Sequence, residues 1–238
     1  MMTDVSSEED SSRRRSSTEE VRKMEIKDNV LKEYLKNVYF VSGTALGGKT
    51  TVTSMLGKKY GIPVFDCDDE FDRHRLTAVP ELQPNMCRQF RDADEFFSRT
   101  VEEYRSWLIG SSNEQLDFVI MDLTVLAKDG PVIVDCGITV DQARRLSDVS
   151  RTVFLLKEPG NIVDEYCNRE DHQPFRNWIH SATDYEAAKK LCSDTLTQIN
   201  SEFRKEVMDS EFFWLDRSQG RTAEETLAEV ERHFGFVK

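Results

Sequence analysis

The chain has 238 residues, of which 38% are hydrophobic and 10% aromatic, so it holds enough apolar material for a packed core. This composition excludes a wholly disordered chain, and the length suits one sizeable domain with additions or two small ones. The formal net charge of −12 argues against broad binding to nucleic acid and against binding to anionic membrane surfaces.

The cysteines and the apolar runs bear on the compartment. The five cysteines are scattered, and no two form a C-x-x-C pair, which argues against a disulfide framework and against a tetrahedral zinc site. No run approaches the ~20 apolar residues of a membrane span, and the N-terminus lacks the apolar segment of a secretory signal. We therefore expect a reduced, soluble, cytoplasmic protein.

The N-terminal segment is different in character from the rest. Residues 1–20 are almost all Ser, Thr, Asp, Glu and Arg, and such a segment buries too little to offset the entropy lost on ordering. We expect a disordered polar tail there. Apolar residues then recur at near-helical spacing and predict an amphipathic helix over 21–37, packed on a main domain of residues 38–238.

Short apolar runs alternate with helical patterns through the main domain. The predicted strands are residues 38–41, 63–65, 132–134, 152–156 and 212–215. They are continuous apolar runs, which is typical of parallel strands covered by helices on both faces. Thr139 with Gln142 and Thr222 with Glu225 read as capping boxes at helix starts. The pattern predicts a parallel α/β sheet.

The segment over 67–130 reads as a helical region. The apolar spacing predicts one helix from about residue 93 to 108 and a second from 114 to 127. Residues 118–121 alone are also compatible with a strand. We favour the helix, because the apolar stripe runs on past them and Asp129-Gly130-Pro131 supplies an end.

The most specific motif follows the first predicted strand. It fits G-x-x-x-x-G-K-[ST] fully, and a helical pattern comes after it. Glycines let backbone N–H groups cradle phosphates at a helix N-terminus, the lysine carries a charge for the β/γ-phosphates, and the threonine hydroxyl ligates Mg²⁺. The motif predicts ATP and Mg²⁺ as cofactors. The predicted nucleotide-binding residues are Gly43, Thr44, Ala45, Leu46, Gly47, Gly48, Lys49, Thr50 and Thr51.

Acidic side chains follow the second predicted strand. Asp66, Asp68 and Asp69 stand where ligands bind in open α/β sheets, at the carboxyl end of a strand. One carboxylate there can hold Mg²⁺, and another can accept a proton from an attacking hydroxyl. An acidic turn that caps the next helix is the alternative interpretation.

With these motifs the sequence resembles the shikimate kinase and gluconate kinase branch of the nucleoside-monophosphate-kinase-like P-loop kinases. The stretch from Val64 to Asp72 is similar to a signature of that branch. The resemblance implies a five-stranded sheet in the order 2-3-1-4-5, Asp66 as a metal ligand and Asp68 as the group that acts on the acceptor hydroxyl. The glycine triplet with which shikimate kinases hold shikimate is missing after the third strand.

Three further features fit that resemblance. Asp135 ends an apolar run in the manner of a Walker B aspartate and is a predicted Mg²⁺ ligand; a turn aspartate is the alternative. Arg169 and Arg176 lie in a segment, 167–180, that resembles the lid of these kinases, and they are predicted catalytic residues; surface arginines are the alternative. Arg217 follows the last strand, where such kinases cover the adenine.

The acceptor site is predicted within 67–130. Arg91 lies in a stretch that resembles the substrate-gripping F-R-x-x-E of the branch. Arg73, His74 and Arg88 are the other candidates for an acceptor pocket, and a surface histidine on a helix is the alternative for His74. The tryptophans read as core or near-core residues.

The sequence thus predicts a kinase that transfers phosphate from ATP to a hydroxyl of a small, anionic metabolite. Lys49, Asp68, Arg169 and Arg176 are its predicted catalytic residues, and Thr50, Asp66 and Asp135 its metal ligands. A nucleoside monophosphate kinase and a sugar-nucleotide kinase are alternatives of the same fold. An ATP-binding switch that recruits a protein partner is the alternative from another class. Apart from the small-molecule acceptor we expect no nucleic acid or membrane partner, and a monomer or homodimer.

Overall fold

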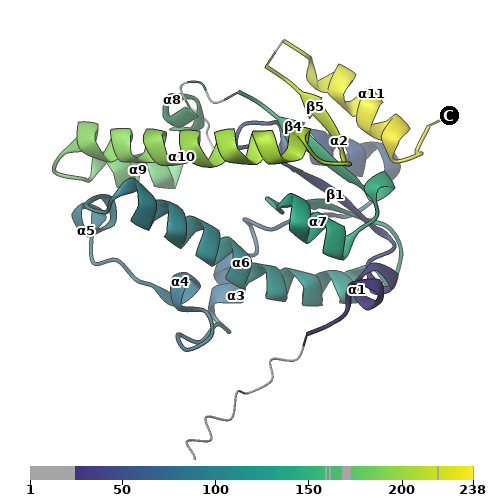
Figure 1. Cartoon of the computed structure of the whole chain (residues 1–238), viewed down its shortest axis with the longest axis horizontal. Coiled ribbons are helices and arrows are strands. Elements are labelled where there is room, and N and C mark those ends of the chain that lie inside the picture. Colours follow the sequence, from purple (N-terminus) through teal and green to yellow (C-terminus); the bar gives the residue numbers. More distant parts are fainter. Residues whose placement is uncertain (1–24, 159, 161, 168–172, 219, 238) are drawn as a thin grey trace, which may run out of the picture.

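A single parallel sheet organises the computed structural model, which describes residues 25–158, 160, 162–167, 173–218 and 220–237. Its strand order, β2-β3-β1-β4-β5, confirms the predicted 2-3-1-4-5 arrangement (Figure 1). All neighbouring strands run parallel. The strands are β1 (Val38–Gly43), β2 (Val64–Asp66), β3 (Val132–Asp135), β4 (Thr152–Leu156) and β5 (Phe213–Asp216).

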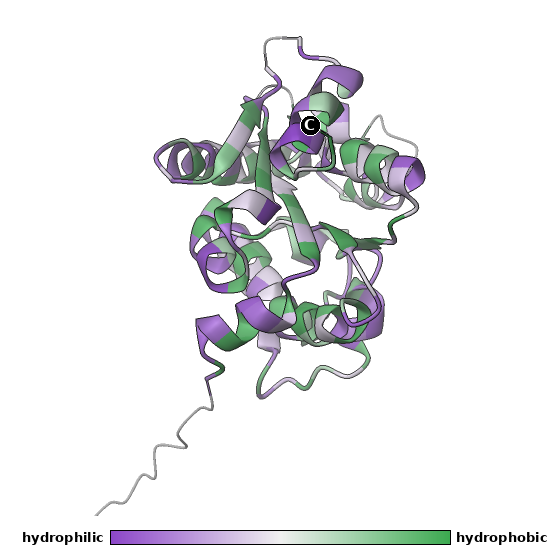
Figure 2. Ribbon diagram, turned by 90° about the vertical axis from the view of Figure 1, so that its right-hand side faces the viewer, coloured by the Kyte–Doolittle hydropathy of each residue, from purple (hydrophilic) through white to green (hydrophobic). Residues whose placement is uncertain are grey.

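Helices cover both faces of the sheet, as the continuous apolar runs indicated, and β3 and β4 are buried along their whole length. Figure 2 shows apolar ribbon gathered on the strands and on the inner sides of the helices. The helices are α1 (Asp28–Tyr34), α2 (Lys49–Tyr60), α3 (Phe71–Arg75), α4 (Pro84–Cys87), α5 (Ala93–Phe97), α6 (Val101–Leu126), α7 (Val140–Leu146), α8 (Ile162–Cys167), α9 (Gln173–His180), α10 (Tyr185–Met208) and α11 (Ala223–His233).

Side chains set several of the helix starts. The predicted capping boxes at Thr139 and Thr222 are confirmed, because each threonine accepts the N–H of the residue three further on and each partner side chain accepts the threonine N–H. Thr100 and Glu103 form a third box, at the start of α6. Among the described residues, no helix combines the length and the apolar character needed to cross a membrane.

The helical region between β2 and β3 differs from the prediction. Residues 114–126 are helical, nearly as expected, but they belong to one helix of 26 residues, α6, which runs unbroken through Gly110. The helix predicted from residue 93 ends early, at Phe97, because Thr100 starts α6. Gly110 allows a close contact between helices and does not end the helix. A Cβ on Gly110 would lie 2.5 Å from the Asn85 side-chain nitrogen, so the lack of a side chain lets α4 approach α6.

The helix predicted over 21–37 is also shorter than expected. Residues 25–27 are not helical, and α1 spans only seven residues, Asp28–Tyr34. Lys27 stands at its N-cap and provides no side-chain acceptor for the free N–H groups. The remainder of the prediction, and the tail over 1–20, lie outside the described residues. Leu31 and Leu35 are buried, and Asp28 pairs with Arg145 of α7 at 3.1 Å.

Three apolar clusters hold the layers together. One packs β-strand side chains against α6 and α7, and another packs the opposite face against α2 and α11. The third lies away from the sheet and joins α5 and α6 to α8, α9 and α10 through residues such as Phe96, Tyr104 and Ile179. The long helices α6 and α10 are also tied by the Arg105–Glu202 ion pair at 2.5 Å. The described part of the predicted lid segment, Cys167 and α9, therefore packs on the predicted acceptor region.

Candidate active site

The loop between β1 and α2 has a backbone shape that depends on its glycines. Gly43 has φ +143°, and a Cβ on it would lie 1.9 Å from the carbonyl oxygen of Leu155. Gly48 has φ +88° and precedes the first turn of α2. The Thr44 N–H donates to the Leu155 carbonyl at 3.1 Å, which fixes the loop to β4. The loop thus has the compact form that backbone phosphate binding requires.

The functional groups of the loop lie at the N-terminus of α2. No side chain caps this end, so its first N–H groups are directed at the space where phosphates bind in such loops. The Lys49 ammonium lies over the loop and donates to the Thr44 carbonyl at 3.3 Å. Thr50 and Thr51 are exposed in the first turn. The structure therefore places all the predicted phosphate-loop residues together.

Two carboxylates meet beside this loop. Asp66 and Asp135 are paired in the register of β2 and β3, and Asp135 in turn is paired with Val41 of β1. Burial and the charge of Asp135 raise the pKa of Asp66 to about 6. Two carboxylates that repel each other in a half-buried place form a donor set suited to a hard cation such as Mg²⁺.

A groove of about 490 Å³ lies between Asp66 and the start of α2. Thr50, Asp66, Asp69 and Glu70 line it, between the start of α2 and the end of β2. Thr50 and Asp66 thus face the same space, as shared ligation of one metal ion requires. Asp68 is exposed, and its N–H donates to the Asp66 carboxylate at 2.9 Å, which orients the turn that carries it.

Arg217 reaches the loop from the end of β5. Its guanidinium donates to the Gly47 carbonyl at 3.2 Å, and its own N–H donates to the Leu156 carbonyl at 2.8 Å. A Cβ on Gly48 would lie 1.5 Å from the Arg217 Nη1 atom, so the side chain rests directly on the loop. The residue predicted from its position after the last strand thus contacts the predicted phosphate loop.

A further contact of the loop was missed from the sequence. The Ala45 N–H donates to the Asn200 side-chain oxygen at 3.2 Å, and Asn200 is buried on α10. The two residues are 155 positions apart, and no motif marks the asparagine, so no signal in the sequence could have found it. Asn200 ties the loop to the helix that also contacts α6.

The predicted lid arginines are placed less fully. Arg169 lies outside the described residues. Arg176 is half-buried on α9 and lies near the Cys167 thiol. Burial raises the pKa of this thiol, and the charge of Arg176 offsets part of that rise. Across the described ranges no recorded contact joins Arg176 to the phosphate loop. Its catalytic role stays a prediction.

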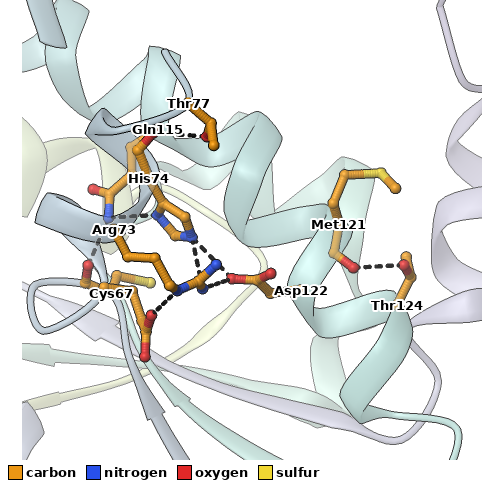
Figure 3. Close-up of polar contacts among 9 residues, drawn as sticks. Cys67, Arg73, His74, Thr77, Gln115, Met121, Asp122 and Thr124 are labelled. Carbon is orange, nitrogen blue, oxygen red and sulfur yellow. Dashed lines mark hydrogen bonds and ion pairs between the residues drawn. The ribbon is translucent and has the colours of Figure 1, made fainter. Parts of the chain in front are cut away.

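Arg73 and His74 lie in a network that fixes α3 to α6 (Figure 3). His74 is only 2% exposed, and its Nε2 atom lies 2.8 Å from the Asp122 carboxylate. Arg73 pairs with Glu70 at 2.5 Å and also with Asp122. The Gln115 amide donates to the Cys67 carbonyl at 2.6 Å and lies 3.3 Å from His74 Nδ1. His74 is thus neither a surface histidine nor part of a lined pocket.

The same network contains three further potential metal ligands, a histidine and two carboxylates. The ligand atoms of Glu70, His74 and Asp122 lie within 4.8 Å of one another. Arg73 pairs with both carboxylates, however, so a guanidinium already balances their charge. The arrangement therefore fits a structural ion-pair network better than a cation site.

The other two acceptor candidates lie in different surroundings. Arg91 is 78% exposed and pairs with its neighbour Asp92 at 2.9 Å. Arg88 lies over the Phe90 ring at 4.8 Å and lines a hollow of about 390 Å³, which we call the aromatic pocket. Its aromatic lining residues are Phe71, Phe90, Phe96, Trp107 and Trp178. The sequence reading treated the tryptophans as core or near-core residues and did not find this pocket.

No protein-family model matches the sequence. A shikimate kinase from Persephonella marina (strain DSM 14350 / EX-H1) is 24% identical over 171 residues, 71% of this chain and 90% of the relative. The solved shikimate kinase from Bacteroides thetaiotaomicron has 16% identity and a TM-score of 0.46, covering 82% of this chain and 96% of that one. The dephospho-CoA kinase from Campylobacter jejuni has 12% identity and a TM-score of 0.45, covering 84% and 99%.

The TM-scores are low, so the topology, the phosphate loop and the sequence relative carry the assignment. The strand order is the one expected for this group of kinases, and the loop joins β1 to α2 with its lysine and threonine in place. ATP and Mg²⁺ are the cofactors that such kinases use, and the Asp66–Asp135 pair suits the metal. The strand order, the phosphate loop and the similarity to a shikimate kinase together support a P-loop kinase of the nucleoside-monophosphate-kinase-like group.

Proposed function

We propose that this kinase transfers the γ-phosphoryl group of ATP to a hydroxyl of a small, anionic metabolite. One observation carries the proposal: the phosphate loop, the Asp66–Asp135 pair and the exposed Asp68 lie together at the carboxyl edge of the sheet. A nucleotide, a metal and an acceptor hydroxyl meet at such an edge in open α/β folds.

The phosphate loop has the task of holding and orienting the nucleotide. Backbone N–H groups at the start of α2 bind phosphate oxygens, and the Lys49 ammonium exchanges the Thr44 carbonyl for a phosphate. Arg217, which rests on the loop, packs beside the base. Thr50, Asp66 and Asp135 hold Mg²⁺, which when bound supplies positive charge that offsets charge on the transferring phosphoryl group.

Asp68 acts on the acceptor. Its carboxylate is exposed beside the groove, and its backbone is tied to Asp66. The group accepts the proton of the attacking hydroxyl and aligns its oxygen with the γ-phosphorus. Arg169 and Arg176, in the lid segment, neutralise charge as the phosphoryl group moves. The acceptor is a small molecule, and its class is taken up below.

Substitutions at Lys49 and Asp68 test these roles separately. Lys49→Ala should lower kcat by about 100-fold or more, because a charge on the transferring group is lost. Asp68→Asn should leave the Kd for ATP unchanged and lower phosphoryl transfer by about 100- to 10,000-fold. Asp117→Asn, at an exposed position of α6 that does not line the groove, is the matched control and should keep most of the activity.

The acceptor is found by incubating the protein with Mg²⁺-ATP and a pooled metabolite extract and reading the products by mass spectrometry. A single phosphorylated product that disappears with Lys49→Ala establishes the transfer. Normal transfer by Asp68→Asn would show that another group handles the hydroxyl proton. ATP binding without any phosphorylated product would contradict the proposed function.

A further inference from the structure

The aromatic pocket is lined by ring faces and edges, in contrast to the acidic groove beside the phosphate loop. Phe90 and Trp107 are perpendicular, with ring centroids 5.5 Å apart, and so are Phe96 and Trp107 at 5.4 Å. Trp178 of α9 also lines the pocket, and its ring centroid lies 6.3 Å from that of Phe96. Walls of this kind favour a flat conjugated ring, which gains stacking contacts that a sugar acid cannot make.

The wall of the aromatic pocket is also positively charged. Arg75 and Arg88 line it, and Arg88 has no ion pair within the part of the chain that the structure describes. Behind the wall lies Arg99, only 9% exposed, with its guanidinium 4.2–4.9 Å from the rings of Phe90, Phe96, Tyr104 and Trp107.

Arg99 forms no ion pair with a carboxylate among the described residues, although the charge of Glu103 acts on it from a greater distance. Its Nε donates to the Phe96 carbonyl at 2.8 Å, while Nη1 and Nη2 are buried with no hydrogen-bond partner there. Burial, and the charge of Arg88, lower its pKa. Arg99 does not line the pocket, so it acts on a ligand through the rings and through its field. An anionic ligand in the pocket would add negative charge close to Arg88 and Arg99.

The pocket is connected to the transfer site by adjacent residues. Phe71 lines the aromatic pocket, whereas Glu70, the residue before it, lines the groove that holds Thr50 and Asp66. Because these two lining residues are consecutive, the pocket and the groove approach each other at the start of α3. The volume of about 390 Å³ falls within the range of sites for small molecules.

A flat ring, an anionic group and a free hydroxyl occur together in nucleotides. We propose that the aromatic pocket binds a nucleotide as the acceptor, with its base among the rings, its phosphate facing Arg75 and Arg88, and a sugar hydroxyl directed to Asp68. This inference rests on the proposed function for the transfer step and on the pocket for the acceptor class.

The transfer balances without any further reactant. The sugar hydroxyl oxygen forms a bond to the γ-phosphorus of ATP while the bond from that phosphorus to the β–γ bridging oxygen breaks. The hydroxyl proton passes to the Asp68 carboxylate and then to solvent. The products are a phosphate ester of the nucleotide and ADP.

Binding is measured by tryptophan fluorescence in a Trp214→Phe protein, because the two tryptophans that remain, Trp107 and Trp178, both line the pocket. The ligands are AMP, GMP, CMP and UMP, the matching nucleosides, and gluconate as a ring-free acid. Titrations are run with and without Mg²⁺ and a non-hydrolysable ATP analogue, which blocks the phosphate loop. At least one monophosphate should bind about tenfold more tightly than its nucleoside and than gluconate, with the analogue present.

A charge variant tests the role of the arginine directly. Arg88→Gln should reduce the preference for the monophosphate over its nucleoside to about threefold or less, while the nucleoside affinity stays the same. Arg145→Gln is the matched control, since Arg145 lies on α7 and pairs with Asp28. Loss of nucleoside binding together with monophosphate binding would mean that Arg88 shapes the pocket rather than binding the anion, and would overturn its assignment.

The outcomes separate this inference from the proposed function. If gluconate binds as tightly as every monophosphate, or no monophosphate changes the fluorescence, the nucleotide assignment is overturned; transfer to a ring-free acid would then leave the kinase proposal standing. If a monophosphate binds the pocket but nothing receives phosphate from ATP, the pocket assignment holds and the transfer proposal fails. Phosphorus NMR of a product should show an ester; an anhydride would mean that the phosphate, not a hydroxyl, is the acceptor.

Discussion

The phosphate loop and the aromatic pocket are built from different kinds of atoms. In the loop the binding groups are backbone N–H groups held in place by glycines and by carbonyls of β4, so a short run of sequence specifies nearly all of it. In the aromatic pocket the lining groups are side chains from α3, α4, α5, α6, α9 and the segment after α4. The comparison teaches that the proposed nucleotide site depends on backbone geometry, whereas the proposed acceptor site depends on how distant helices pack.

The strongest test of the role of backbone geometry in the phosphate loop is Gly43→Ala. A Cβ at this position would lie 1.9 Å from a backbone oxygen of β4, and φ is +143°, so the loop must move. We expect the Kd for ATP to rise about 100-fold or more, because several phosphate contacts depend on one backbone shape. Isothermal titration calorimetry measures it.

Gly61→Ala is the matched control for this prediction. Gly61 also has a positive φ, +64°, but a Cβ there meets nothing within 4 Å. The substitution should cost about 1 kcal/mol of the free energy of unfolding and leave ATP binding unchanged. Equal ATP affinity in the two variants would show that the loop tolerates a side chain at Gly43.

The role of side-chain contacts between distant helices is tested by Asp122→Ala, which removes a contact between α6 and α3. The Asp122 carboxylate contacts both the buried His74 and Arg73, and its removal leaves a buried nitrogen without that partner. We expect the free energy of unfolding to fall by about 2–3 kcal/mol, measured by urea denaturation, while the Kd for ATP stays the same. Asp117→Ala, at an exposed position of α6, should change stability by under about 0.5 kcal/mol.

Asp66 lies beside the phosphate loop and lines the groove with Thr50. The pH dependence of stability that this carboxyl causes gives a third test. Because its pKa is raised from 3.8 to about 6 in the fold, the folded state holds this proton more tightly than the unfolded one. Its contribution to stability is therefore fully present below about pH 4 and is lost as the pH rises through 6. Without metal, Asp66→Asn should raise the free energy of unfolding by about 1 kcal/mol at pH 7.5 and change it little at pH 4.

Mg²⁺ supplies the control for that prediction. If the carboxylate belongs to a metal site, saturating Mg²⁺ should stabilise the wild type more than Asp66→Asn at pH 7.5, and the difference should vanish at pH 5, where Asp66 is mostly protonated. Thermal unfolding at the two pH values measures this. An equal response of both proteins to Mg²⁺ would remove Asp66 from the metal site.

The smallest expected effect concerns the approach of α4 to α6. Gly110→Ala gains helix propensity but places a Cβ 2.5 Å from the Asn85 side chain, which is flexible enough to move. We expect a net loss of stability of about 1 kcal/mol or less. In an Asn85→Ala background the same change should become neutral or stabilising, and a double-mutant cycle measures the difference. No coupling between the two positions would show that the approach does not depend on the glycine.

Local signals in the sequence predicted the regular elements and failed where contact decided the outcome. The strands and two of the capping boxes were found, since apolar runs and cap residues act over a few positions. The gap predicted between residues 108 and 114 was wrong, because α6 runs through it unbroken, and Gly110 within it lies where Asn85 of α4 approaches. The N-terminal helix was predicted too long because amphipathic spacing continues before Lys27 although residues 25–27 are not helical.

The sequence by itself determined the phosphate loop, the parallel strands that present it and the acids that follow the second strand, because each is a short pattern with one physical use. Only the tertiary structure decided that His74 is buried against Asp122, that Asn200 contacts the loop and that two tryptophans line a pocket with Arg88. These contacts join residues far apart in the chain, and a side chain's chemistry does not reveal its partner. Packing determines which distant side chains meet. It therefore determines the shape and the charge of the proposed acceptor pocket.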